Sequence, residues 1–273
     1  MILRSVFNHR HMPVTLLALL MLALAACATP PTDPAARAEY DETNDPLEPL
    51  NRKIFAFNLF FDRIIFRPVA VTYDAAVPEL ARNTIRHFLD NLGEPVVFAN
   101  NLLQGEFKRA HDTAGRFLMN STFGVGGLMD VATKEGLEKQ TGDFGQTLYY
   151  WGIPDGPYLV LPILGPSNPR DGIGMAVDGY ADPYSHAFSG SSIDNPDYGR
   201  YVVNGVDQRA RNIQTLDELQ RNAIDFYSQL RSLFRQHRAS ELRHGEPAPL
   251  PELDTLYQDP ASQQPQVSQA KPR

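Results

Sequence analysis

The 273-residue chain has very little of what covalent or metal-bound frameworks require. Its single cysteine, Cys27, excludes an internal disulfide and a cysteine-rich zinc site. Positive charge is also scarce, since the chain has 25 Lys and Arg residues compared with 32 Asp and Glu residues. The resulting net charge of -7 disfavours binding to nucleic acid or to anionic head groups through charge alone. The 42% hydrophobic and 10% aromatic content in turn excludes global disorder.

Motifs for catalysis are also lacking. The chain has no Gly-Lys dipeptide for a Walker A loop, and the glycine-rich segment Asn120–Gly127 lacks GxGxxG and predicts a connection with positive φ values. Ser167 lies in Gly-Pro-Ser-Asn-Pro, which is not a nucleophile elbow, and no His-Glu-x-x-His occurs. Asp171, Asp178 and Asp182 lack EF-hand spacing but leave a Ca²⁺ site open. The sequence thus predicts no enzyme, no catalytic residue, no bound metal and no cofactor.

The N-terminus is typical of an exported lipoprotein. Arg4 and Arg10 precede an uncharged apolar run, Val14–Ala26, which suits a secretory h-region and is too short to span a bilayer. Small residues directly before Cys27 resemble the lipobox of bacterial lipoproteins. That resemblance implies a signal peptide over residues 1–26 and a covalent lipid on Cys27. In such lipoproteins, an aspartate directly after the cysteine implies retention in the inner membrane. This chain has Ala28 at that position, which implies export to the outer membrane.

Composition divides the mature chain into three parts. Residues 27–44 are rich in Pro, Ala, Thr and acidic residues, which predicts a flexible tether. Residues 245–273 contain repeated prolines and glutamines without apolar periodicity, which predicts a disordered tail. Residues 45–244 remain as one folded domain.

Helical spacing of apolar residues predominates within that domain. It predicts helices over Leu47–Ile65, over Leu80–Leu92 with a break at Pro95, and over Phe107–Leu118. The clearest pattern predicts one long amphipathic helix over Leu216–Phe234. Because Gly142–Gly174 is dense in Gly and Pro and strand signals are weak, we expect a mainly α fold with long irregular connections.

One helical segment is apolar on nearly all sides. Residues 54–61 contain one polar residue in eight, so this helix is buried either in the protein core or in lipid. Its position just after a lipidated tether favours lipid, where two or three rings would hold the body of the protein in the membrane. The residues predicted to embed are Ile54, Phe55, Phe57, Phe60 and Phe61.

Fixed residues at fixed spacings give the chain a family resemblance. It resembles the MlaA (VacJ) family of outer-membrane lipoproteins over about residues 45–188, and more loosely in the C-terminal helix. The segments that carry the resemblance include Asp45–Glu48, Asn51–Arg52, Phe57–Asn58, Arg67–Ala70, Gly124–Gly127, Phe144–Leu148, Trp151–Gly152 and Gly156–Pro162.

This resemblance implies a single ring-like helical domain with an amphipathic channel. Such a protein lies in the periplasmic leaflet of the outer membrane, beside trimeric porins. Phospholipid misplaced in the outer leaflet would pass through the channel to a soluble periplasmic carrier, which maintains lipid asymmetry. The implied partners are therefore phospholipid, the outer membrane, a porin and the carrier, and no nucleic acid.

The resemblance also places a channel-lining hairpin at Phe144–Gly156. Glycines there would permit hinge motion, and apolar side chains would contact acyl chains; the residues are Phe144, Gly145, Leu148, Trp151, Gly152 and Gly156. Two other interpretations stay open at this point. These residues would form only a tight turn on the core, or the whole protein would be a lipidated adaptor that docks to porins without transporting lipid.

Overall fold

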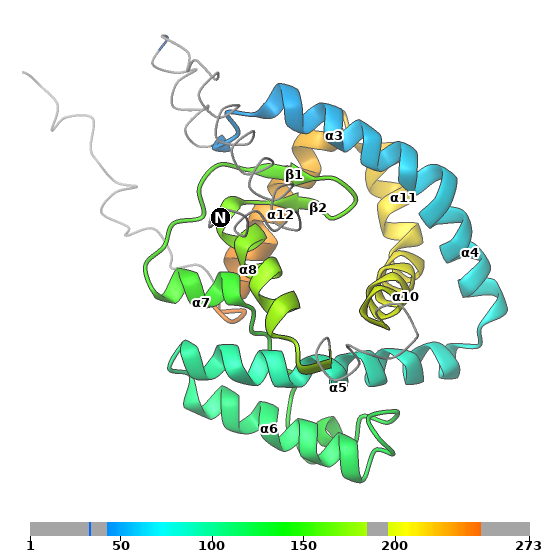
Figure 1. Cartoon of the computed structure of the whole chain (residues 1–273). Coiled ribbons are helices and arrows are strands. Elements are labelled where there is room, and N and C mark those ends of the chain that lie inside the picture. Colours follow the sequence, from blue (N-terminus) through cyan, green and yellow to red (C-terminus); the bar gives the residue numbers. More distant parts are fainter. Residues whose placement is uncertain (1–32, 34–42, 185–195, 247–273) are drawn as a thin grey trace, which may run out of the picture.

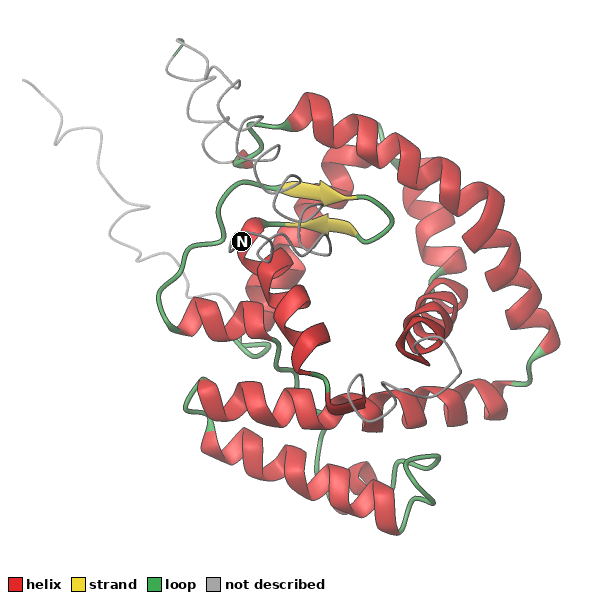
Figure 2. Ribbon diagram, in the orientation of Figure 1, coloured by secondary structure: helices red, strands yellow, loops and turns green. Residues whose placement is uncertain are grey.

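The computed structural model describes residues 33, 43–184 and 196–246. Helices dominate this part of the chain, and a single short hairpin supplies the strands that it contains (Figure 2). The mainly α prediction is therefore confirmed. Cys27, the predicted signal peptide, nearly all of the predicted tether and residues 247–273 of the predicted tail lie outside the described residues.

The N-terminal part of the domain is one long helical arc. It consists of α3 (Glu48–Phe61), the π-helical segment η1 (Asp62–Phe66) and α4 (Arg67–Ala76) (Figure 1). The widened π turn ends at Phe66, two residues before Pro68, whose nitrogen has no hydrogen to donate to the carbonyl four residues back. The arc ends at Val77, which takes the extended backbone that a following proline favours.

The next two helices, α5 (Glu79–Leu103) and α6 (Phe107–Thr122), pack against each other. The predicted break at Pro95 is wrong, because α5 continues through this residue. A proline inside a helix costs about 3 kcal/mol. Buried contacts on both sides of it offset that cost, among them the ion pair at 3.1 Å between Glu94 and Arg116 of α6, each with a 3% exposed side chain.

Residues that appear irregular in the sequence form four regular elements. After the 3₁₀ turn η2 (Ala132–Glu135) come α7 (Phe144–Tyr150), the antiparallel strands β1 (Leu159–Leu161) and β2 (Gly165–Ser167), and α8 (Pro169–Ala181). Side-chain caps define both helix starts, because the Asp143 side chain accepts from the Gln146 amide and that of Asn168 from the Asp171 amide. Pro162, which weakened the strand prediction, lies in the turn between the strands.

The C-terminal part is α10 (Pro196–Arg211), α11 (Ile213–Asn222) and α12 (Phe226–Leu242). The prediction of one helix over Leu216–Phe234 is wrong, since α11 ends at Ala223 with extended backbone. The Asp225 side chain then accepts a hydrogen bond from the Tyr227 amide and starts α12.

These elements are arranged as a ring (Figure 1). The ring closes where α10 contacts α4 and α5, where α11 contacts α4, and where the hairpin contacts α3 and α12. The main apolar cluster is small and lies at the junction of α3, β1 and α12: Phe55, Tyr158, Val160 and Tyr227 are buried there. Because a ring has no single central core, many apolar side chains lie either along its central opening or on its outer surface.

Helices α7 and α8 approach each other closely at Gly145 and Gly174. A Cβ atom added at Gly174 would lie 2.4 Å from the Gly145 nitrogen and 2.8 Å from its Cα atom. Gly172 is on the same helix, and a Cβ atom there would meet nothing within 4 Å.

We therefore expect opposite effects from two Gly→Ala changes in α8. Gly174→Ala should lower the free energy of unfolding by about 1–3 kcal/mol because backbone must move, whereas Gly172→Ala should raise it by up to about 1 kcal/mol through helix propensity. Urea denaturation monitored by circular dichroism measures both. Equal effects of the two changes would contradict the close α7–α8 packing.

Candidate functional site

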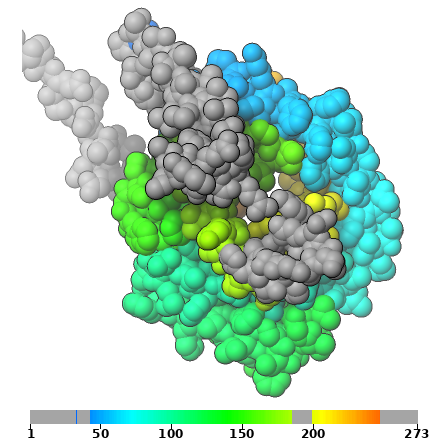
Figure 3. All heavy atoms as spheres, viewed as in Figure 1, coloured from blue at the N-terminus to red at the C-terminus, as the bar shows by residue number. Residues whose placement is uncertain are grey.

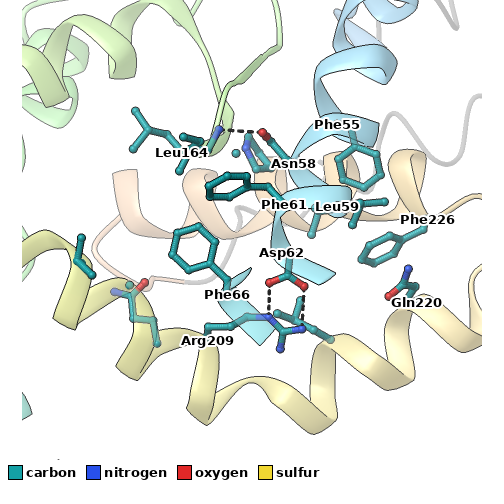
Figure 4. A pocket seen from close by; sticks show the side chains of 18 of the residues that line it. Phe55, Asn58, Leu59, Phe61, Asp62, Phe66, Leu164, Arg209, Gln220 and Phe226 are labelled. Carbon is teal, nitrogen blue, oxygen red and sulfur yellow. Dashed lines mark hydrogen bonds and ion pairs between the residues drawn. The ribbon is translucent and has the colours of Figure 1, made fainter. Parts of the chain in front are cut away.

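A cavity of about 500 Å³ lies within the ring, between the N-terminal arc, the hairpin and the three C-terminal helices. The space-filling view shows the surface hollowed near its centre, and the close-up shows the lining side chains (Figures 3 and 4). Most of the lining is apolar. It comprises Phe55, Leu59, Phe61 and Phe66 from the arc, Ile163, Leu164 and Pro166 from the hairpin, and Tyr201, Val202, Leu216, Phe226 and Leu230 from the C-terminal helices.

Two asparagines of α3 hold the hairpin at the edge of this cavity. Asn51 donates to the Tyr158 carbonyl at 3.0 Å and accepts from the Val160 amide at 3.0 Å. Asn58, two turns later on the same helix face, donates to the Leu161 carbonyl at 2.9 Å and accepts from the Ile163 amide at 2.8 Å. This role is not among those predicted from the sequence. The available signal was two asparagines seven residues apart inside a helix, where asparagine is disfavoured.

The polar part of the wall is an ion-paired network. Arg209 of α10 donates to both carboxylate oxygens of Asp62, at 2.7 and 3.0 Å (Figure 4). Asp217 of α11 lies 3.8 Å from Arg209 and accepts from Arg67 of α4 at 2.7 Å. Asp62 and Arg209 line the cavity and compensate each other's charge, so the cavity has a charged but balanced side next to its apolar lining.

The predicted membrane-embedding segment faces three different environments. The prediction is wrong for Phe55, which is buried in the protein core with its ring centroid 5.6 Å from that of Phe226. Ile54 packs against the same core, and Phe61 lines the cavity. Phe57 and Phe60 are 48% and 59% exposed, and embedding remains a prediction for them. The segment is apolar on all sides because it serves the core, the cavity and the outer surface at once.

Exposed apolar side chains continue along the arc beyond Phe60. They are Ile64, Ile65, Val69 and Val71. Within the described part of the chain, the helices are either too short or too polar to cross a membrane. The arc therefore presents an apolar face without a membrane-spanning helix.

The predicted channel segment has a different local structure from the one expected. Phe144–Tyr150 is the helix α7, and the hairpin that lines the cavity is instead Leu159–Ser167, so the predicted hairpin position is wrong. Phe144 stacks edge-on against the half-exposed Trp151, and Leu148 is buried. None of the predicted channel residues lines the cavity. Their part in lipid passage stays a prediction.

The three glycines of that segment differ in conformation. Gly152 and Gly156 have φ values of +83° and +74°, which favour glycine. Gly145 lies inside α7, where an added Cβ atom would come within 2.6 Å of a carboxylate oxygen of Asp171. Gly152, which has open space around it, is therefore the best placed of the three for a hinge.

One arginine ties α7 to the rest of the ring. Arg238 of α12 donates to both carboxylate oxygens of Asp143 at 2.8 Å and to both of Asp171 at 2.9 Å. Burial alone would raise the pKa of Asp171, but the hydrogen bonds and charge of Arg238 outweigh it and lower the pKa below its usual value. Burial opposes the charge of Arg238 as well, yet the two carboxylates raise the pKa of its guanidinium.

The residues considered for other chemistry have structural partners. Ser167 is buried, and its hydroxyl donates to the Asn168 carbonyl at 3.3 Å. Asp178 accepts from the Phe144 amide, and Asp182 pairs with Arg200, so the three aspartates lie in separate contacts. No group of three or more His, Cys, Asp and Glu side chains in the described ranges is placed to hold a metal ion.

The glycine-rich segment forms the predicted connection after α6. Val125, Gly126 and Gly127 have positive φ values, as expected. The side chain of Asn120 accepts from the amides of Val131 and Ala132, both at 2.9 Å, and so fixes the end of the loop.

Comparisons with known proteins agree on one family. A family model described as MlaA lipoprotein matches residues 43–241. The chain is 35% identical over 209 residues to a protein of Rickettsia felis, covering 75% of this chain and 80% of the relative. It is also 35% identical over 224 residues to the Intermembrane phospholipid transport system lipoprotein MlaA of Escherichia coli, covering 81% and 84% of the two chains.

A solved structure shares the fold as well. It comes from work described as "Structural basis for maintenance of bacterial outer membrane lipid asymmetry" and superposes with a TM-score of 0.65 at 35% identity, covering 72% of this chain and 98% of the other. The match to the family model, over residues 43–241, spans the arc, the hairpin and nearly all of the C-terminal helices described above. On these grounds the chain belongs to the MlaA lipoprotein family.

Proposed function

We propose that this protein removes mislocalised phospholipid from the outer leaflet of the outer membrane and passes it inward through the ring. The observation that carries the proposal is the cavity, which combines an extended apolar wall with one ion-paired polar side. A phospholipid has the same division between acyl chains and a charged head. Each methylene group transferred from water to such a wall stabilises the bound state by about 0.8 kcal/mol.

The exposed apolar face of the arc supports partial insertion of the arc into the membrane. Phe57 and Phe60 would enter the periplasmic leaflet of the outer membrane together with the aliphatic side chains that follow them. Acyl chains on Cys27 would supply the anchor, since two or more chains hold a protein stably on a bilayer. The rings would then set the depth and orientation of the cavity.

The names of the relatives support a transfer of phospholipid between membranes. Because the relatives from Escherichia coli and Haemophilus influenzae are named as lipoproteins of an intermembrane phospholipid transport system, a downstream acceptor is required. We propose a soluble periplasmic carrier as this acceptor and a trimeric porin as the neighbour in the membrane. No enzymatic step is needed for such a passive route.

A deletion strain tests this function. Loss of the gene should increase phospholipid in the outer leaflet, and the wild-type chain should restore the normal level. Cys27→Ala should fail to restore it, because the body would leave the membrane. Outer-leaflet phospholipid is measured by labelling exposed phosphatidylethanolamine with an amine reagent that does not cross the membrane.

The alternatives give different results in the same strain. A lipidated adaptor predicts an unchanged outer leaflet and a purified protein free of phospholipid. An enzyme predicts lyso-lipid or free fatty acid as product. If Cys27→Ala stays on the membrane, the aromatic face anchors the protein without the acyl chains.

A further inference from the structure

A second, smaller hollow of about 220 Å³ adjoins the cavity. It is lined by Leu59, Asp62, Arg63, Arg67 and Gln220. Three of these, Leu59, Asp62 and Gln220, also line the large cavity. The wall between the two hollows therefore consists of three side chains, and we call this set the thin wall.

The small hollow has a basic rim. Arg63 and Arg67 are both exposed, and Arg67 pairs with Asp217 at 2.7 Å. Arg63 makes no ion pair within the described part of the chain. A guanidinium that is not neutralised by a carboxylate is a good donor to a phosphate oxygen. This rim contrasts with the net negative charge of the whole protein.

The thin wall combines one ion pair with one apolar contact, since Leu59 packs against the apolar cluster around Phe55. Asp62 belongs to the π-helical segment η1, and its partner Arg209 comes from α10 (Figure 4). Leu59 is half-buried, and Gln220 is exposed on α11. π-helical turns are often found at functional sites. The Arg209 and Asp62 side chains are 11% and 30% exposed, so this partly buried pair has to separate before the thin wall can open.

We infer that the thin wall is a side portal, through which a phospholipid moves between the cavity and the small hollow while Arg63 binds its phosphate. The inference rests on the proposed function and adds a specific route to it. The acyl chains would lie along the apolar lining, and the phosphate would stay at the basic rim. Asp62 would release Arg209 when the portal opens.

A bulky residue in the thin wall tests the route. The acylated full-length protein is loaded with a fluorescent phospholipid, and exchange into vesicles of phosphatidylethanolamine and phosphatidylglycerol is followed. Gln220→Trp should slow exchange about tenfold, equivalent to about 1.4 kcal/mol of barrier. The matched control is Gln214→Trp, also an exposed glutamine of α11, which lines neither hollow and should change the rate less than about twofold.

Charge removal tests the rim. Arg63→Gln should slow exchange about threefold through the lost phosphate contact, while Lys53→Gln, which removes an exposed cation from α3, should have no effect. Asp62→Asn should speed exchange up to about fivefold because it weakens the ion pair with Arg209 that has to separate when the portal opens. Inorganic phosphate should not compete, since it has no acyl chain to enter the cavity.

The outcomes separate the two claims. If the wild-type protein neither carries nor exchanges phospholipid, the proposed function fails. If it does, but Gln220→Trp folds and exchanges lipid at the wild-type rate, the portal is overturned while the function stands. Competition by inorganic phosphate as strong as that by phospholipid would show that the rim binds free phosphate instead.

Discussion

Gly205→Phe should block the cavity without weakening the fold. Gly205 lines the cavity from α10, and an added Cβ atom there meets nothing within 4 Å. A phenyl ring at this position would occupy space that we assign to acyl chains. Displacing two methylene groups from the apolar wall costs about 1.6 kcal/mol. We therefore expect phospholipid binding to fall more than about tenfold.

The same change should leave stability unchanged or slightly higher, since glycine inside a helix is unfavourable by roughly 0.5–1 kcal/mol. The control is Gly199→Phe, a glycine of the same helix that also has open space around it and does not line the cavity. Co-purified phospholipid, quantified by mass spectrometry, and the melting temperature are measured for both variants. Wild-type lipid content in a folded Gly205→Phe protein would contradict the proposal that this cavity holds the lipid.

Arg238→Met should produce the largest loss of stability. The Arg238 side chain is 11% exposed, and it makes four hydrogen bonds to Asp143 and Asp171. Without it, the buried carboxylate of Asp171 would lose its main partner. Removal of one member of a buried ion pair costs about 3–5 kcal/mol. That is a large fraction of the free energy of unfolding of a domain, which is roughly 5–15 kcal/mol. Urea denaturation measures the change.

The control is Arg221→Met, which removes an exposed arginine of α11 and should cost less than about 0.5 kcal/mol. In the double variant Arg238→Met with Asp171→Asn, the loss should be smaller than the sum of the two single losses, because the unpaired charge is gone. Strict additivity would mean that the two residues do not act together.

This pairing also predicts how acid affects the protein. Because the folded-state pKa of Asp171 lies below its unfolded value, its contribution to stability is present above about pH 3.9 and is lost as the pH falls through the folded-state pKa. In Arg238→Met, burial would dominate and raise that pKa. The midpoint of acid unfolding should therefore shift to higher pH, which circular dichroism across a pH series can follow.

Several features of the fold follow from the sequence alone, because local signals specify them. Apolar spacing over Phe107–Leu118 predicts α6, and turn residues predict the connection after it. The helix break at Ala223–Asp225 had a local signal too, an aspartate at a cap position. The long apolar stripe outweighed that signal in the prediction.

Other features depend on what lies across the ring. Periodicity indicates which residues are apolar and does not indicate what they face. Phe55 and Phe57 are two residues apart, yet one packs on Phe226 of the C-terminal helix and the other is half-exposed. Pro95 stays inside a helix because α6 packs beside it. The hairpin forms where Asn51 and Asn58 supply hydrogen bonds from more than 100 residues away.

The helical class, the family resemblance and the expectation of a lipidated cysteine all follow from the amino-acid sequence, since each rests on local pattern or on fixed spacing. The position of the cavity and the side chains that form it depend on how the chain folds in three dimensions. Its lining runs from Phe55 to Leu230, so it exists only when the two ends of the domain meet. A cavity built from residues that distant has no local signature. Its ion-paired wall, from Asp62 to Arg209, becomes visible only once the ring is closed.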